Sequence, residues 1–205
     1  MSGRHFAPAS EQPNSFVFSK ETMLAAEAVI AKYPPGHQQS ACIPLLDLAQ
    51  RQHGGWLPKA AIRAVAELLM MPEIRALEVA TFYTMFNLAP VGKHLVQVCR
   101  TTPCWLRGSD DLINACREHL DVELGGSSDD GEFTLVEVEC LGACVNAPVV
   151  QINDNYYEDL DAERMVSLLD DLKAGKPVTI GSQEHNRDTS APIGGRTTLL
   201  AEDGT

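Results

Sequence analysis

Apolar residues recur every three to four positions from residue 15 to residue 88, which is the period of an amphipathic helix. Ser19 can cap a first helix, which Pro34, Pro35 and Gly36 end. Three further helices are predicted, starting near Ser40, Pro58 and Pro72. Four short helices with brief connections predict a helical bundle over residues 15–90, preceded by a flexible N-terminus over residues 1–14.

The pattern changes at His94. Residues 95–99 and 133–139 alternate between apolar and polar positions, as strands do, and Asn153-Asp154 lies between two further short strand patterns. Helices are expected to begin at caps Ser109 and Asp161. This order predicts an α/β domain over residues 91–175 whose first crossover is parallel. Residues 176–205 contain several Gly and Pro residues and little periodicity, which predicts an extended C-terminal tail.

Charge and composition narrow the functional classes. The chain has 205 residues and a formal net charge of −12, which disfavours nucleic acid as a partner because phosphate binding needs a concentrated positive face. No apolar run approaches the roughly 18 residues of a transmembrane helix, so direct membrane insertion is not expected. The N-terminus lacks the apolar core of a secretory signal. Six cysteines in such a chain are expected to be metal ligands, redox groups or buried thiols.

Four of these cysteines are expected to meet. Cys99 and Cys104 are spaced C-x₄-C, and Cys140 and Cys144 are spaced C-x₃-C. Each pair begins where a predicted strand ends, and strand ends can meet at one edge of a sheet. Thr101 and Gly142 lie inside the two loops, where a hydroxyl and backbone amides can donate to sulfur.

Four thiolates are the usual ligands of [2Fe–2S] and [4Fe–4S] clusters. A structural zinc site also takes four cysteines, although its spacing is typically C-x₂-C, and inert or redox thiols are a third possibility. The remaining cysteines, Cys42 and Cys116, fall in apolar helical patterns and are predicted to be buried and structural. No G-x-G-x-x-G segment follows a strand and no P-loop is present, so the chain itself is not expected to bind a nucleotide.

Two long segments resemble a known family. They are ATFYTMFNLAPVGKHLVQVCRTTPCWLRGSDDL at residues 80–112 and VECLGACVNAPVVQINDNYYEDL at residues 138–160. They resemble the small [2Fe–2S] subunit of NADH:quinone oxidoreductase, respiratory complex I, and the likeness covers most of residues 20–180.

The resemblance implies a helical bundle followed by a thioredoxin-like [2Fe–2S] ferredoxin domain. It implies one [2Fe–2S] cluster on Cys99, Cys104, Cys140 and Cys144. It also implies a neighbouring subunit that binds FMN and NADH, and further subunits of the peripheral arm.

The expected activity is electron transfer as a subunit of the enzyme, with an isolated chain that does not oxidise NADH. The expected location is the cytoplasmic side of the bacterial inner membrane, or the matrix side in mitochondria. Two alternatives are a diaphorase subunit of a soluble NAD-linked formate dehydrogenase or hydrogenase, and a zinc-stabilised interaction module.

Overall fold

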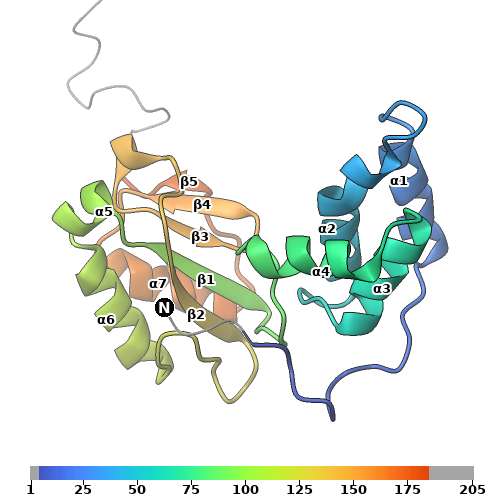
Figure 1. Ribbon diagram of the computed structural model, residues 1–205. Coiled ribbons are helices and arrows are strands. Elements are labelled where there is room, and N and C mark those ends of the chain that lie inside the picture. Colours follow the sequence, from blue (N-terminus) through green and yellow to red (C-terminus); the bar gives the residue numbers. More distant parts are fainter. Residues whose placement is uncertain (1–4, 185–205) are drawn as a thin grey trace, which may run out of the picture. The chain divides into compact units, whose positions relative to one another are not determined.

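The computed structural model describes residues 5–184, which divide into two compact units between residues 91 and 92 (Figure 1). The first unit is helical, and the second is a sheet with helices beside it. The predicted tail, residues 176–205, is described only as far as residue 184. Among the described residues, no helix is long and apolar enough to cross a bilayer.

The first unit contains the four predicted helices: α1 (Lys20–Ile30), α2 (Cys42–Gln52), α3 (Lys59–Leu68) and α4 (Glu73–Phe82). The hydroxyl of Ser19 accepts a hydrogen bond from the Thr22 amide at 3.1 Å, so the predicted cap of α1 is confirmed. Helices α3 and α4 begin directly after Pro58 and Pro72, as expected. The predicted start of α2 at Ser40 is wrong, because a 3-10 turn, η1 (Gln38–Ala41), precedes it.

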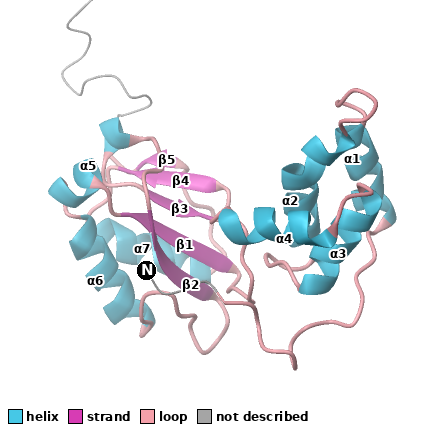
Figure 2. Ribbon diagram, viewed as in Figure 1, coloured by secondary structure: helices cyan, strands magenta, loops and turns pink. Residues whose placement is uncertain are grey.

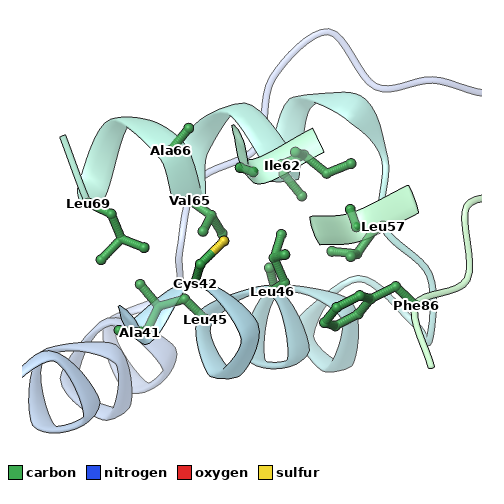
Figure 3. Packing of buried hydrophobic residues seen from close by; sticks show 14 of the residues in the cluster. Ala41, Cys42, Leu45, Leu46, Leu57, Ile62, Val65, Ala66, Leu69 and Phe86 are labelled. Carbon is green, nitrogen blue, oxygen red and sulfur yellow. The ribbon is translucent and has the colours of Figure 1, made fainter. Parts of the chain in front are cut away.

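The inner faces of α2 and α3 form much of the core of this unit, to which α1, α4 and the side chains of Leu57 and Phe86 also contribute (Figure 3). Leu45 and Leu46 of α2 are fully buried, as is Val65 of α3. The Cys42 thiol lies among these side chains and is also buried, as its apolar helical setting predicted. Burial raises the pKa of Cys42 to about 11, so the thiol stays protonated at neutral pH.

The second unit is built on a five-stranded sheet (Figure 2). Its strands are β1 (His94–Cys99), β2 (Phe133–Val138), β3 (Val150–Ile152), β4 (Asn155–Glu158) and β5 (Gly181–Ser182), in the order β2-β1-β3-β4-β5. Strands β1 and β2 are parallel, which confirms the predicted crossover. Strands β3 and β4 form the predicted antiparallel hairpin, with Asn153 in the left-handed region at φ 54°.

The helices of this unit are α5 (Thr102–Leu106), α6 (Ser109–Leu120) and α7 (Ala162–Lys173), with a 3-10 turn, η2 (Cys144–Asn146). Asp161 caps α7 as predicted, since its carboxylate accepts from the Arg164 amide at 2.8 Å. The prediction that Ser109 caps α6 is wrong: Gly108 occupies the cap at φ 95°, and Ser109 is the first helical residue. A side chain is disfavoured at that backbone conformation, so glycine suits the cap.

Helices α6 and α7 contact each other, and α6 contacts β1 and β2. Their apolar faces share one core with the sheet, in which Val96, Leu135 and Met165 have no exposed surface. Cys116 of α6 lies in this core and is fully buried, as predicted. This packing fixes the carboxyl ends of β1 and β2, where the cysteine pairs begin.

Candidate metal centre

The two cysteine pairs begin at neighbouring strand ends. Cys99 is the last residue of β1, and its register partner is Val138, the last residue of β2. Cys140 follows two residues after Val138. Because β1 and β2 run parallel, both chains leave the sheet at the same edge, which is how residues far apart in sequence become neighbours.

Each pair brings its two thiols into contact. The Sγ atoms of Cys140 and Cys144 are 3.5 Å apart, and the thiols of Cys99 and Cys104 are hydrogen-bonded to each other. The hydroxyl of Thr101 lies 3.4 Å from the Cys99 sulfur and also hydrogen-bonds Cys140. The structure therefore brings together all four cysteines selected from the sequence, with Thr101 between the pairs.

Hydrogen bonds favour the thiolate form at one cysteine of each pair. Burial raises the pKa of Cys99, but hydrogen bonds from Thr101 and from the Leu141 amide outweigh it and hold the pKa below its ordinary value. The Gly142 amide donates to Cys140 and lowers its pKa, with Cys144 as a second donor. Gly142 has φ 86°, so the expected glycine-specific turn that aims an amide at sulfur is present.

The second cysteine of each pair has a raised pKa, which favours the protonated thiol. Burial and the hydrogen bond with Cys99 raise the pKa of Cys104 to about 12. The hydrogen bond with Cys140 raises the pKa of Cys144. Within each pair one sulfur therefore accepts while the other keeps its proton, and a bound metal would displace that proton because it binds the thiolate.

Exposure differs between the pairs. Cys99 and Cys104 are each 1% exposed, whereas Cys140 and Cys144 are both exposed. The loop that carries the exposed pair is held by Tyr156, whose hydroxyl donates to the Leu141 carbonyl at 2.8 Å. A group held by all four thiols would have one side in the protein and one side at the surface.

The local helix around Cys104 was not foreseen. Cys104 lies in α5, whereas only a loop was expected between Cys99 and Cys104. The signal was present in the sequence: Thr101 is extended, and Pro103 occupies the first turn of α5, where proline is favoured because its missing N–H has no helical partner. The helix is only five residues long, which is below the length that hydrophobic periodicity detects.

Other candidate side chains lie elsewhere. Cys42 and Cys116 belong to the two hydrophobic cores, and burial raises the pKa of Cys116 to about 12. His119 hydrogen-bonds Asp170 at 2.8 Å on the surface of the second unit. In residues 5–184, no three His, Cys, Asp or Glu side chains converge as the ligands of a single metal ion.

The donor set fits a two-iron cluster. Such a cluster is held by four cysteine thiolates, two on each iron. Here four thiols form two contacting pairs, and hydroxyl and amide donors already point at their sulfurs. Hydrogen bonds to sulfur stabilise the negative charge of cluster and ligands, so these donors suit the group.

Comparisons with known proteins agree with this chemistry. The family model described as thioredoxin-like [2Fe–2S] ferredoxin matches residues 26–173, a span that contains all four cysteines. A relative from Rickettsia bellii, a subunit of NADH-quinone oxidoreductase, is 60% identical over 159 residues, which are 78% of this chain and 95% of that protein. The mitochondrial NADH dehydrogenase [ubiquinone] flavoprotein 2 of Dictyostelium discoideum is 51% identical over 185 residues, 90% of this chain and 74% of that protein.

Among solved structures, an NAD⁺-reducing [NiFe]-hydrogenase in the H₂-reduced state matches with a TM-score of 0.56 over 65% of this chain. The match covers 23% of the hydrogenase chain at 22% identity, so it shows a shared fold and nothing further.

Proposed function

The chain belongs to the thioredoxin-like [2Fe–2S] ferredoxin family, and from this premise we propose that Cys99, Cys104, Cys140 and Cys144 hold one [2Fe–2S] cluster. The chain is an electron-transfer subunit of an NADH:quinone oxidoreductase, respiratory complex I. The observation that carries the ligand assignment is the convergence of two contacting thiol pairs at one edge of the sheet.

The contacts between thiols support a proposal about which cysteines share an iron. Cys99 and Cys104 are hydrogen-bonded to each other and would bind one iron, while Cys140 and Cys144, 3.5 Å apart, would bind the other. The buried pair would hold the first iron inside the protein, and the exposed pair would hold the second at the surface. Electrons would enter and leave on the side of Cys140 and Cys144.

The bound cluster supplies a one-electron acceptor, which a reduced flavin needs because it receives two electrons from NADH and can release them singly. The residues of this chain set the conditions for that step. Thr101 and the amides of Leu141 and Gly142 donate to the ligand sulfurs, and so favour the more negative, reduced state. Burial of Cys99 and Cys104 keeps water from one side of the site.

The electron donor that we propose is the FMN of a neighbouring NADH-binding subunit, among other subunits of the peripheral arm. Exposed apolar side chains close in sequence to the ligands support docking of that subunit beside the cluster. Trp105 is 54% exposed, Leu106 is 70% exposed and Val145 is 61% exposed. In the helical unit, Phe82 and Met85 are 77% and 50% exposed. Apolar surface of this kind is typical of contact regions between proteins.

The proposed role as an electron acceptor for another subunit also implies a location. We place the chain in the peripheral arm of the complex, on the cytoplasmic side of the bacterial inner membrane. By itself the chain would not oxidise NADH, because its sequence contains no nucleotide-binding fingerprint.

A diaphorase subunit of a hydrogenase or formate dehydrogenase is the second candidate; the NAD⁺-reducing hydrogenase shares its fold with this chain, and a fold by itself does not assign a role. The 60% identity to the Rickettsia bellii relative favours complex I over this candidate. A zinc-stabilised module would leave the protein colourless and without a redox signal.

The experiment is to purify the full chain anaerobically and measure iron, acid-labile sulfide and zinc. We expect two irons and two sulfides, visible absorbance, and an electron paramagnetic resonance (EPR) signal of a [2Fe–2S]⁺ centre after reduction. Stoichiometric zinc without iron would overturn the ligand assignment. Copurification from a host that makes the complex would then test whether the flavin-binding protein is the partner.

A further inference from the structure

Arg100 lies in a side-chain network that joins β1, which contains Cys99, to α5, which contains Cys104, and to the end of β2, two residues before Cys140. It directly follows Cys99, and its backbone amide donates to the Val138 carbonyl at 3.1 Å, which extends the pairing of β1 with β2 past the last residue of β1. Its side chain then turns to two carboxylates. The Nε atom donates to Asp110 of α6 at 2.9 Å, and an Nη atom donates to Glu137 of β2 at 3.0 Å.

The same network reaches the helix of Cys104. The second carboxylate oxygen of Asp110 accepts a hydrogen bond from the indole Nε1 of Trp105 at 3.0 Å. Trp105 is the neighbour of Cys104 in α5, and Glu137 lies three residues before Cys140. Arg100 and Asp110 together therefore tie the end of β1, the end of β2, α5 and the start of α6.

Stability alone does not account for this arrangement. The side chains of Arg100, Asp110 and Glu137 are all more than two-fifths exposed, and ion pairs this exposed stabilise a fold little. The network instead holds a positive charge in a defined position. One guanidinium lies between two carboxylates in the residues that flank the cysteines, and guanidinium stays charged at every working pH.

We propose that the charge of Arg100 tunes the reduction potential of the cluster, an inference that rests on the proposed function. Reduction adds one electron to an anionic group, and no bond forms or breaks. The positive charge of Arg100, the residue that follows Cys99, would favour the reduced state, and the two carboxylates would oppose it. Asp110 and Glu137 hold the guanidinium in one place, so that its charge acts on the cluster with a constant effect.

The proposal predicts opposite shifts from two variants of one network. Arg100→Gln removes the positive charge and should lower the potential. Glu137→Gln removes a negative charge, leaves the Trp105–Asp110 hydrogen bond in place, and should raise the potential. If the substitutions only loosened the loops, both variants would shift the reduction potential in the same direction. Shifts of opposite sign therefore distinguish an electrostatic role from a merely structural one.

The test is a potentiometric titration of the anaerobically purified full chain, followed by EPR. Each single variant is expected to change the one-electron equilibrium constant three- to tenfold, where tenfold corresponds to 59 mV. Arg100→Lys keeps the charge and should restore most of the wild-type potential. The shifts should shrink as salt rises from 0.05 to about 0.5 M, because exposed charges are screened.

Arg117→Gln is the matched control. Arg117 also forms an exposed ion pair in the second unit, with Glu123 at 2.7 Å, but belongs to neither cysteine loop. Its loss should leave the potential unchanged.

Equal potentials in all variants, or shifts of the same sign for Arg100→Gln and Glu137→Gln, would overturn the proposal. A wild-type chain without a [2Fe–2S] signal would instead refute the proposed function. If Arg100→Gln fails to assemble a cluster, Glu137→Gln decides: a raised potential, with Arg100→Lys close to the wild type, supports the proposal, and a lowered potential overturns it.

Discussion

Cys99 and Val138 are register partners at the ends of the parallel strands β1 and β2. This single pairing explains why two cysteine loops that are distant in sequence lie together, because both leave the sheet at one edge. It also explains why the site has a buried side. Cys99 is still part of the sheet and is shielded by it, whereas Cys140 has already left β2 and is exposed.

The first prediction concerns the ligands. Cys104→Ala or Cys140→Ala should abolish the visible absorbance and the EPR signal, because three thiolates cannot complete two irons. Cys116→Ala and Cys42→Ala should keep both signals and lower the free energy of unfolding by about 1–3 kcal/mol through lost packing. A Cys116→Ala variant that folds but has lost the absorbance would refute the assignment.

The second prediction concerns thiol reactivity in the apo chain. Cys140 is exposed and its pKa is lowered by the Gly142 amide, so it should react first with an alkylating reagent at neutral pH. Cys42 and Cys116 should react only after unfolding, since burial raises their pKa values to about 11 and about 12. Mass spectrometry of peptides from a timed alkylation gives the order, and early labelling of Cys116 would contradict the structure.

The third prediction compares two glycines. A Cβ at Gly92 would lie 2.7 Å from the backbone carbonyl carbon of Phe133, so Gly92→Ala should force β1 and β2 apart and cost several kcal/mol in the free energy of unfolding. A Cβ at Gly142 would have no atom within 4 Å, so Gly142→Ala is strained only by the backbone φ of 86°. This strain should lower the free energy of unfolding by about 1–2 kcal/mol.

Because Gly142 aims an amide at Cys140, its replacement should also change the cluster's EPR or absorbance spectrum, whereas Gly92→Ala should act on stability first. Thermal unfolding and EPR of both variants provide the measurement. An unchanged spectrum in Gly142→Ala would show that the amide does not contact a ligand sulfur.

The fourth prediction concerns pH and the ion pair between Asp130 and Lys173, whose atoms lie 2.8 Å apart. Lys173 and the Ser128 hydroxyl lower the pKa of Asp130, so the pair's stabilisation is present above the unfolded pKa of about 4 and is lost as the pH falls through the lowered value. Lys173 has its pKa raised by Asp130, so this contribution is lost again as the pH rises through that raised value.

Lys173→Met should therefore reduce stability between about pH 5 and pH 9, and the difference from the wild type should shrink at acid pH. Urea unfolding at several pH values measures this difference. A difference that grows as the pH falls below about 4 would contradict the pairing.

The fifth prediction concerns the partner. The isolated chain should not oxidise NADH, whereas its complex with the flavin-binding protein should reduce an artificial acceptor. Phe82→Glu places a charge in exposed apolar surface and should weaken copurification while leaving the cluster spectrum unchanged. Leu24→Glu is the control, because Leu24 is 67% exposed but lies on α1, whereas Phe82 is the last residue of α4. Equal losses of binding in both variants would argue against a specific surface around Phe82.

A related truncation tests the tail. Deleting the residues after Lys176 should weaken copurification with the flavin-binding protein and leave the EPR signal in place. Loss of the signal would show that β5, which pairs with β4, is needed to hold the site.

Much of this protein follows from local sequence patterns. The helices of the first unit have the 3.6-residue period, and the caps Ser19 and Asp161 are used as their sequence context indicates. The parallel crossover follows from the strand–helix–strand order, and the spacing of four cysteines at two strand ends was enough to nominate the site. The helices and their caps depend on interactions between residues that are near in sequence, so a local pattern can predict them.

The tertiary structure decided what depends on distant residues. The sequence did not distinguish a buried cysteine pair from an exposed one, because burial of Cys99 and Cys104 comes from the sheet and the loops packed around them. It also held no sign that Arg100 would meet Asp110 and Glu137, since that contact exists only once β1, β2 and α6 are assembled. Side-chain electrostatics are set by distance in space, and a one-dimensional pattern does not contain that distance.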